Sequence, residues 1–79
     1  MTDVYEAKRD FVERHLAETV IAASRGIVLE MWYEHHPNGS EFVYAAIRGM
    51  ERPVRINVHM DSEWAVIKDV LKGLIPYVE

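Results

Sequence analysis

Cysteine is absent from this chain of 79 residues. Without thiols there can be no disulfide framework, no thiolate zinc site and no cysteine nucleophile. Long apolar runs are also lacking, and none approaches the roughly 20 residues of a membrane span. Residues 2–10 are polar and acidic, unlike the apolar segment of a signal peptide. We therefore expect a cytoplasmic protein with no membrane partner.

Positive charge is in short supply, since 9 Lys and Arg face 13 Asp and Glu and give a net charge of −4. Binding to nucleic acid needs clustered positive charge, so this balance argues against a nucleic-acid partner. Apolar residues make up 49% and charged residues 28%, which is ordinary for a folded chain. With no linker, repeat or low-complexity segment, residues 1–79 are predicted to form one domain with a small core.

The N-terminal part of the chain has the period of an amphipathic helix. Thr2 or Asp3 can cap this helix, and the apolar stripe continues to Ala23. Gly26 suits the left-handed position after the helix, because glycine enters it without a steric cost. His15 falls within the apolar stripe. We therefore expect it at the edge of the core, with a backbone or carboxylate partner.

The period then changes to two, which indicates strands over residues 27–34, 41–50 and 53–60. Pro37-Asn38-Gly39 suits a three-residue hairpin loop between the first two. This loop predicts three apolar cross-strand pairs: Tyr33 with Val43, Met31 with Ala45, and Leu29 with Ile47. A two-residue loop would shift the pairing by one and set Leu29 against Arg48, which burial does not tolerate.

A second helix is expected after a cap at Asp61 or Ser62, and Gly73 and Pro76 are expected to end it. Its predicted apolar arc contains Trp64, Ile67, Val70, Leu71, Leu74 and Ile75. The sequence thus predicts an α+β fold of order α-β-β-β-α, a three-stranded antiparallel meander with both helices packed on one face.

The face of the sheet without helices is the candidate binding surface. Its predicted residues are Val28, Glu30, Trp32, Glu34, Phe42, Tyr44, Ala46, Arg48, Arg55, Asn57 and His59. Trp32 and Tyr44 are predicted cross-strand neighbours, with Phe42 one row along. Aromatic residues and arginine are enriched at binding hot spots, which singles out Trp32, Phe42, Tyr44, Arg48, Arg55 and His59. The alternative is that the aromatic pairs only stabilise the sheet.

The histidines do not form a metal-site pattern. His35 and His36 are adjacent in an extended segment, so their side chains point to opposite faces. His59 shares a face with His36 but lies about 10 Å or more away by strand spacing. Zinc ligands must all lie about 2 Å from the metal. We expect no metal, and we expect His35 to lie opposite Glu41, which would favour its protonated ring.

Catalytic motifs are also missing from the sequence. There is no glycine-rich phosphate loop, no G-x-S-x-G elbow and no H-E-x-x-H motif. Ser24, Ser40 and Ser62 each have a structural explanation, at a helix end, a hairpin and a cap. No nucleophile with a convincing base emerges, so we expect a protein that is not an enzyme and needs no cofactor.

The α-β-β-β-α order resembles the double-stranded-RNA-binding fold. Residues 54–71 and the pair His35-His36 are similar to parts of the HicA toxin family, small RNA-cleaving proteins of that fold. The resemblance implies RNA contact through Arg48, Arg52 and Arg55. Because Glu34 stands where the family motif has serine, the catalytic roles of that motif are not carried over to this chain.

The size, the acidic charge and the open face also resemble those of small bacterial or phage proteins that act by binding another protein, such as secretion chaperones, immunity proteins and anti-CRISPR inhibitors. The sequence therefore favours a small acidic protein-binding module that forms a homodimer or acts as an inhibitor or adaptor of a protein partner. The alternative is an RNA-contacting domain.

Overall fold

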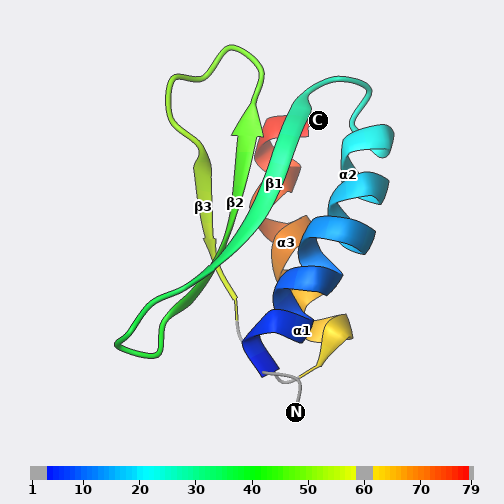
Figure 1. Ribbon diagram of the computed structural model, residues 1–79. Helices are drawn as coiled ribbons and strands as arrows, with labels where there is room; N and C mark the ends of the chain where they lie inside the picture. The colour runs from blue at the N-terminus through cyan, green and yellow to red at the C-terminus, as the bar shows by residue number, and fades with distance from the viewer. Residues whose placement is uncertain (1–3, 59–61, 79) are drawn as a thin grey trace.

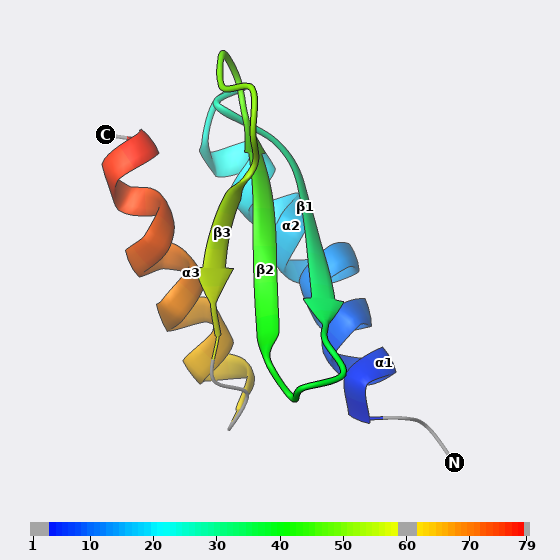
Figure 2. The ribbon, with the colours of Figure 1, turned by 90° about the vertical axis from the view of Figure 1, so that its left-hand side faces the viewer.

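The chain folds into one long helical segment, a three-stranded sheet and a C-terminal helix, as a computed structural model shows for residues 4–58 and 62–78 (Figure 1). Its elements are α1 (Val4–Asp10), η1 (Phe11–Leu16), α2 (Ala17–Ala23), β1 (Val28–His35), β2 (Glu41–Ile47), β3 (Val54–Asn57) and α3 (Glu63–Val78). The strands form an antiparallel meander in the order β1-β2-β3. Both helical segments lie on one face of this sheet (Figure 2). The predicted α-β-β-β-α order is confirmed.

The first helix is continuous from residue 4 to residue 23 but widens in its middle segment, η1. The backbone N–H of Ala17 donates to the carbonyl of Val12, five residues earlier, which is the pattern of a π-helix. Val12, Leu16 and Ala17 therefore share the buried face of the helix. His15 is exposed. Its expected place at the edge of the core is wrong, because the wider turn rotates this residue away from the sheet.

The helix ends in a turn that ties it to β1. The hydroxyl of Ser24 donates to the carbonyl of Ile21 and accepts the backbone N–H of Val28, both at 2.9 Å. Gly26 has a φ of 90°, as its predicted left-handed position requires. The left-handed region begins one residue earlier, however, since Arg25 has a φ of 56°.

The hairpin between β1 and β2 has the predicted three-residue loop. His36 donates its backbone N–H to the carbonyl of Ser40 at 2.9 Å, and Gly39 has a φ of 91°. The predicted pairs Tyr33–Val43 and Met31–Ala45 are confirmed by the observed register.

The third predicted pair is wrong, because a β-bulge shifts the register between Val28 and Glu30. Val28 lies opposite Ile47 and is fully buried, whereas Leu29 is 55% exposed. Val28 therefore belongs to the core and not to the outer face. The contiguous apolar residues at 27–29 fit either register, so the alternation could not reveal the bulge.

The core lies between the helices and the inner face of the sheet. Each strand contributes alternate residues to it, and η1, α2 and α3 supply the opposite side. Its buried members are Val12, Leu16, Ala17, Val28, Met31, Tyr33, Val43, Ala45, Ile47, Ile56, Val58, Val66, Val70 and Leu74.

Helix α3 begins where the hydroxyl of Ser62 accepts the backbone N–H of Ala65 at 3.2 Å, as an N-cap does. The expectation that Gly73 and Pro76 end this helix is wrong, because it continues to Val78. A proline so close to the C-terminus removes only one hydrogen bond of the last turns. Gly73 has a packing role, since a Cβ on it would lie 2.8 Å from Cγ1 of Ile56.

The apolar arc of α3 is narrower than predicted. Val66, Val70 and Leu74 are buried. Three members of the predicted arc are instead exposed: Trp64, Leu71 and Ile75. The helix therefore has more apolar residues than its contact with the sheet can cover.

The second and third strands are shorter than predicted. β2 ends at Ile47, where the backbone N–H of Met50 closes a turn onto the Ile47 carbonyl at 3.1 Å. β3 ends at Asn57, although Val58 still donates its N–H to the carbonyl of Glu41 at 3.2 Å. The remaining predicted residues of the third strand, 59 and 60, and the caps proposed at Thr2, Asp3 and Asp61 lie outside the described residues.

Within residues 4–58 and 62–78, none of the helices combines the length and the apolar character that crossing a bilayer requires.

Gly73→Ala should destabilise the fold. Alanine gains up to about 1 kcal/mol in helix propensity, but overpacking against Ile56 costs roughly 1–3 kcal/mol. In an Ile56→Ala background, the same substitution should become neutral or stabilising, because the contact is gone. Urea unfolding of the four chains of this cycle measures the coupling. Additive effects of the two substitutions would contradict the proposed contact.

Candidate binding surface

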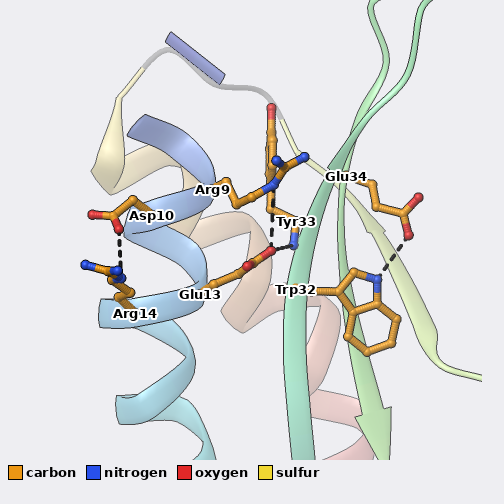
Figure 3. Close-up of polar contacts among 7 residues, drawn as sticks. All are labelled: Arg9, Asp10, Glu13, Arg14, Trp32, Tyr33 and Glu34. Carbon is orange, nitrogen blue, oxygen red and sulfur yellow. Dashed lines mark hydrogen bonds and ion pairs between the residues drawn. The ribbon is translucent and has the colours of Figure 1, made fainter. Parts of the chain in front are cut away.

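The bare side of the sheet carries a cluster of aromatic rings from β1 and β2. Trp32 lies directly opposite Tyr44, and their rings stack with centroids 5.6 Å apart and planes 7° apart. Phe42 tilts against Tyr44 at a centroid distance of 6.3 Å. Figure 3 shows Trp32 pointing away from the first helix. Because alternate strand residues share a face, the register that buries Tyr33 and Val43 places these rings outside.

Two charged groups flank the rings. The indole Nε1–H of Trp32 donates to Oε2 of Glu34 at 3.0 Å (Figure 3). Arg55, which lies opposite Tyr44 on β3, places its Cζ 4.9 Å from the centre of the Phe42 ring. At an exposed site such a cation–π contact contributes about 0.5–1 kcal/mol. We call Trp32, Phe42, Tyr44 and Arg55 the aromatic face.

His36 extends this surface, although the sequence analysis did not assign it to the site. Its ring stands edge-on to Phe42, with centroids 5.3 Å apart and planes 84° apart. Its Nε2 lies 3.8 Å from Oε1 of Glu34, beyond hydrogen-bond length, and is buried without a hydrogen-bond partner. The alternation that places Trp32 and Glu34 outside continues to residue 36, and this signal could have identified it.

Of the predicted site residues that the structure describes, Arg48 lies away from the aromatic face. Arg48 lies beyond the end of β2, and its Nη1 is 3.7 Å from the point that a Cβ on Gly26 would occupy. By strand rise this is roughly 20 Å from Phe42. The alternation that placed Arg48 beside the rings stops at Ile47, where β2 ends. His59 lies outside the described residues.

A second polar cluster lies on the helical side of the sheet, near the β1–β2 hairpin. Tyr33 is only 1% exposed, and its hydroxyl donates to Oε1 of Glu41 at 2.5 Å. The ammonium of Lys8 contacts the same oxygen at 2.9 Å. His35 lies opposite Glu41 as predicted, but its ring stacks on Tyr5 with centroids 3.6 Å apart. The expected His35–Glu41 pairing therefore holds for the backbone, while Lys8 and Tyr33 bind the carboxylate.

The first helix also covers the free edge of β1. Oε2 of Glu13 accepts the backbone N–H of Tyr33 at 3.0 Å, and Nε of Arg9 lies 3.9 Å from the same oxygen (Figure 3). An unpaired N–H on an edge strand is a site where another strand can add. Glu13 satisfies this donor. Asp10 and Arg14 form an exposed ion pair at 3.1 Å on the far side of the helix.

Burial raises the pKa of Tyr33 well above its ordinary value, and the hydrogen bond to Glu41 and the charge of that carboxylate raise it further. Tyr33 therefore stays a neutral donor throughout the physiological range. Its position in the core and its bond to Glu41 indicate a structural role.

Among residues 4–58 and 62–78, no three His, Asp or Glu side chains come together as a metal site would require. The chain matches no family model, no curated protein and no solved structure in the three comparisons with known proteins.

Tyr33→Phe should lower the free energy of unfolding by about 1.5–3 kcal/mol at neutral pH, because the buried carboxylate of Glu41 loses a donor. In the unfolded wild type, Tyr33 ionises near pH 10.0, whereas in the fold it stays protonated. Above that pH this group therefore lowers stability by up to about 1.4 kcal/mol per pH unit. Tyr33→Phe should lack this part of the decrease in unfolding free energy with pH.

Urea unfolding between neutral and alkaline pH measures both effects. Tyr77→Phe is the matched control, since Tyr77 is 40% exposed on α3, and it should change neither quantity. Equal alkaline slopes in the wild type and Tyr33→Phe would contradict this account.

Proposed function

We propose that this chain is a small protein-binding module that recognises its partner through the aromatic face. The observation that carries the proposal is the stack of Trp32 on Tyr44, with Phe42 and Arg55 beside it, on the side of the sheet that the helices leave bare. A lone exposed aromatic residue is ordinary, but adjoining rings with an arginine have the composition of an interface centre.

Two contacts of the cluster restrict its side chains before any partner arrives. The bond from Trp32 to Glu34 restricts the indole, and the contact of Arg55 with Phe42 restricts the guanidinium. Side chains that are already ordered lose less entropy on binding. Ring faces flanked by an acid and a base suit recognition better than catalysis. We therefore propose a role without enzymatic activity, in the cytoplasm.

A second copy of the chain is the partner we propose. An acid, Glu34, lies beside the aromatic face, and a base, Arg55, lies within it. A twofold axis can therefore set Glu34 of each copy against Arg55 of the other. The alternative partner is a different protein, which the module would inhibit or connect to other proteins as an adaptor. RNA contact is the weaker proposal, because Arg48 and Arg55 lie roughly 14 Å apart by strand rise and spacing and the chain carries a net charge of −4.

Trp32→Ala should weaken self-association by at least about 2 kcal/mol, or roughly 30-fold in Kd, as expected for a hot-spot tryptophan. Trp64→Ala is the matched control. Trp64 is 72% exposed on α3, on the other side of the molecule, and its loss should leave association unchanged. Sedimentation equilibrium over a range of protein concentrations measures both constants, and circular dichroism checks that each variant is folded.

A wild type that stays monomeric at all concentrations would exclude the second copy as partner. The module would then have to bind a different protein, and cross-linking to that protein should be lost with Trp32→Ala and kept with Trp64→Ala. Equal effects of the two substitutions would contradict the assignment of the aromatic face.

A further inference from the structure

An apolar groove lies on the helical side of the molecule, between the end of the first helix and the C-terminal half of α3. It has a volume of about 440 Å³, within the range of small-molecule sites. Its lining residues are Thr19, Val20, Ala23, Ser24, Arg25, Ile27, Leu71, Leu74 and Ile75. This groove and the aromatic face are on opposite sides of the sheet.

The walls of the groove explain why α3 has more apolar residues than the core can bury. Leu74 is 2% exposed and belongs to the core, whereas Leu71 and Ile75 are 49% and 46% exposed. The hydroxyl of Thr19 is already bonded to the carbonyl of His15, and that of Ser24 to the carbonyl of Ile21 and the backbone N–H of Val28. The inner part of the groove therefore offers aliphatic contact and little else to a ligand.

Two arginines lie at the α2–β1 turn, which borders this groove. Arg25 is among the lining residues, and Nη1 of Arg48 lies beside Gly26, the next residue in the chain. Within the described residues, 4–58 and 62–78, neither guanidinium has an acidic side chain within ion-pair distance. Two arginines with no acidic partner among the described residues give this turn a local positive charge in a chain of net charge −4.

The backbone of Arg25 gives independent support for a role in binding. Its φ of 56° lies in the left-handed region, which glycine adopts at no cost and a long side chain rarely adopts. Helices often end in one left-handed residue, usually glycine, and strained residues of this kind cluster at functional sites. The turn would be less strained with glycine at position 25.

We propose that this groove binds a single-chain aliphatic carboxylate. The hydrocarbon chain lies between α2 and α3 against Val20, Leu71 and Ile75, and the carboxylate meets Arg25 and Arg48. The aliphatic lining selects the chain, and guanidinium groups pair with a carboxylate through charge-assisted hydrogen bonds. This site is separate from the proposed protein-binding surface and does not depend on it.

Titration of the ¹⁵N-labelled chain with decanoate, below its micelle concentration, tests the proposal by NMR. Amide signals of Val20, Ala23, Leu71 and Ile75 should shift and saturate together. Decyltrimethylammonium, with the same chain length and the opposite charge, should bind at least about tenfold more weakly. Ala23→Trp, which fills the groove, should abolish the response to decanoate.

Arg25→Gly separates binding from folding. It should raise the melting temperature by relieving the left-handed strain, yet weaken decanoate binding by about fivefold or more. Arg25→Lys should restore part of the affinity. Equal affinity for both detergents, or wild-type affinity in Arg25→Gly, would overturn the proposal. So would sedimentation with phosphatidylglycerol vesicles in the absence of any response to decanoate, because the surface would then serve a membrane.

Discussion

The pairing register of β1 and β2 is the constraint on which the rest of this structure depends. The three-residue loop at Pro37-Asn38-Gly39 sets it at one end, and the bulge beside Val28 adjusts it at the other. A slip of one residue would exchange the two faces of the strand. Tyr33 would then lose its place in the core, and Trp32 would leave the surface. The core and the candidate binding surface are thus two results of one register.

The polar contacts of the first helix keep that helix on the inner side of the sheet. Lys8 and Tyr33 share the carboxylate of Glu41, while Glu13 binds the backbone N–H of Tyr33. These bonds position the helix along β1 and satisfy one donor on the edge of that strand. Helix α3 packs against β3 on the same side. Both helical segments therefore lie on one face of the sheet. The sheet is left with one uncovered face, and that face carries the aromatic rings.

The order of elements, the faces of the strands and the hairpin loop could be predicted because each depends on local periodicity or turn chemistry. The cross-strand pairing of Trp32 with Tyr44 followed directly from them. The errors came from tertiary effects. A π turn rotated His15 outward, α3 continued past Gly73 to Val78, and a bulge buried Val28. Arg48 was misplaced because an alternating pattern does not state where a strand ends.

The two indole N–H signals of the chain test directly whether the aromatic face is the contact surface. Trp32 lies in that face, and Trp64 is 72% exposed on α3. In ¹H–¹⁵N spectra recorded over a dilution series, the Trp32 indole signal should move or broaden as association proceeds, and the Trp64 signal should stay in place. Movement of Trp64 alone, or association that leaves both signals unchanged, would contradict the account.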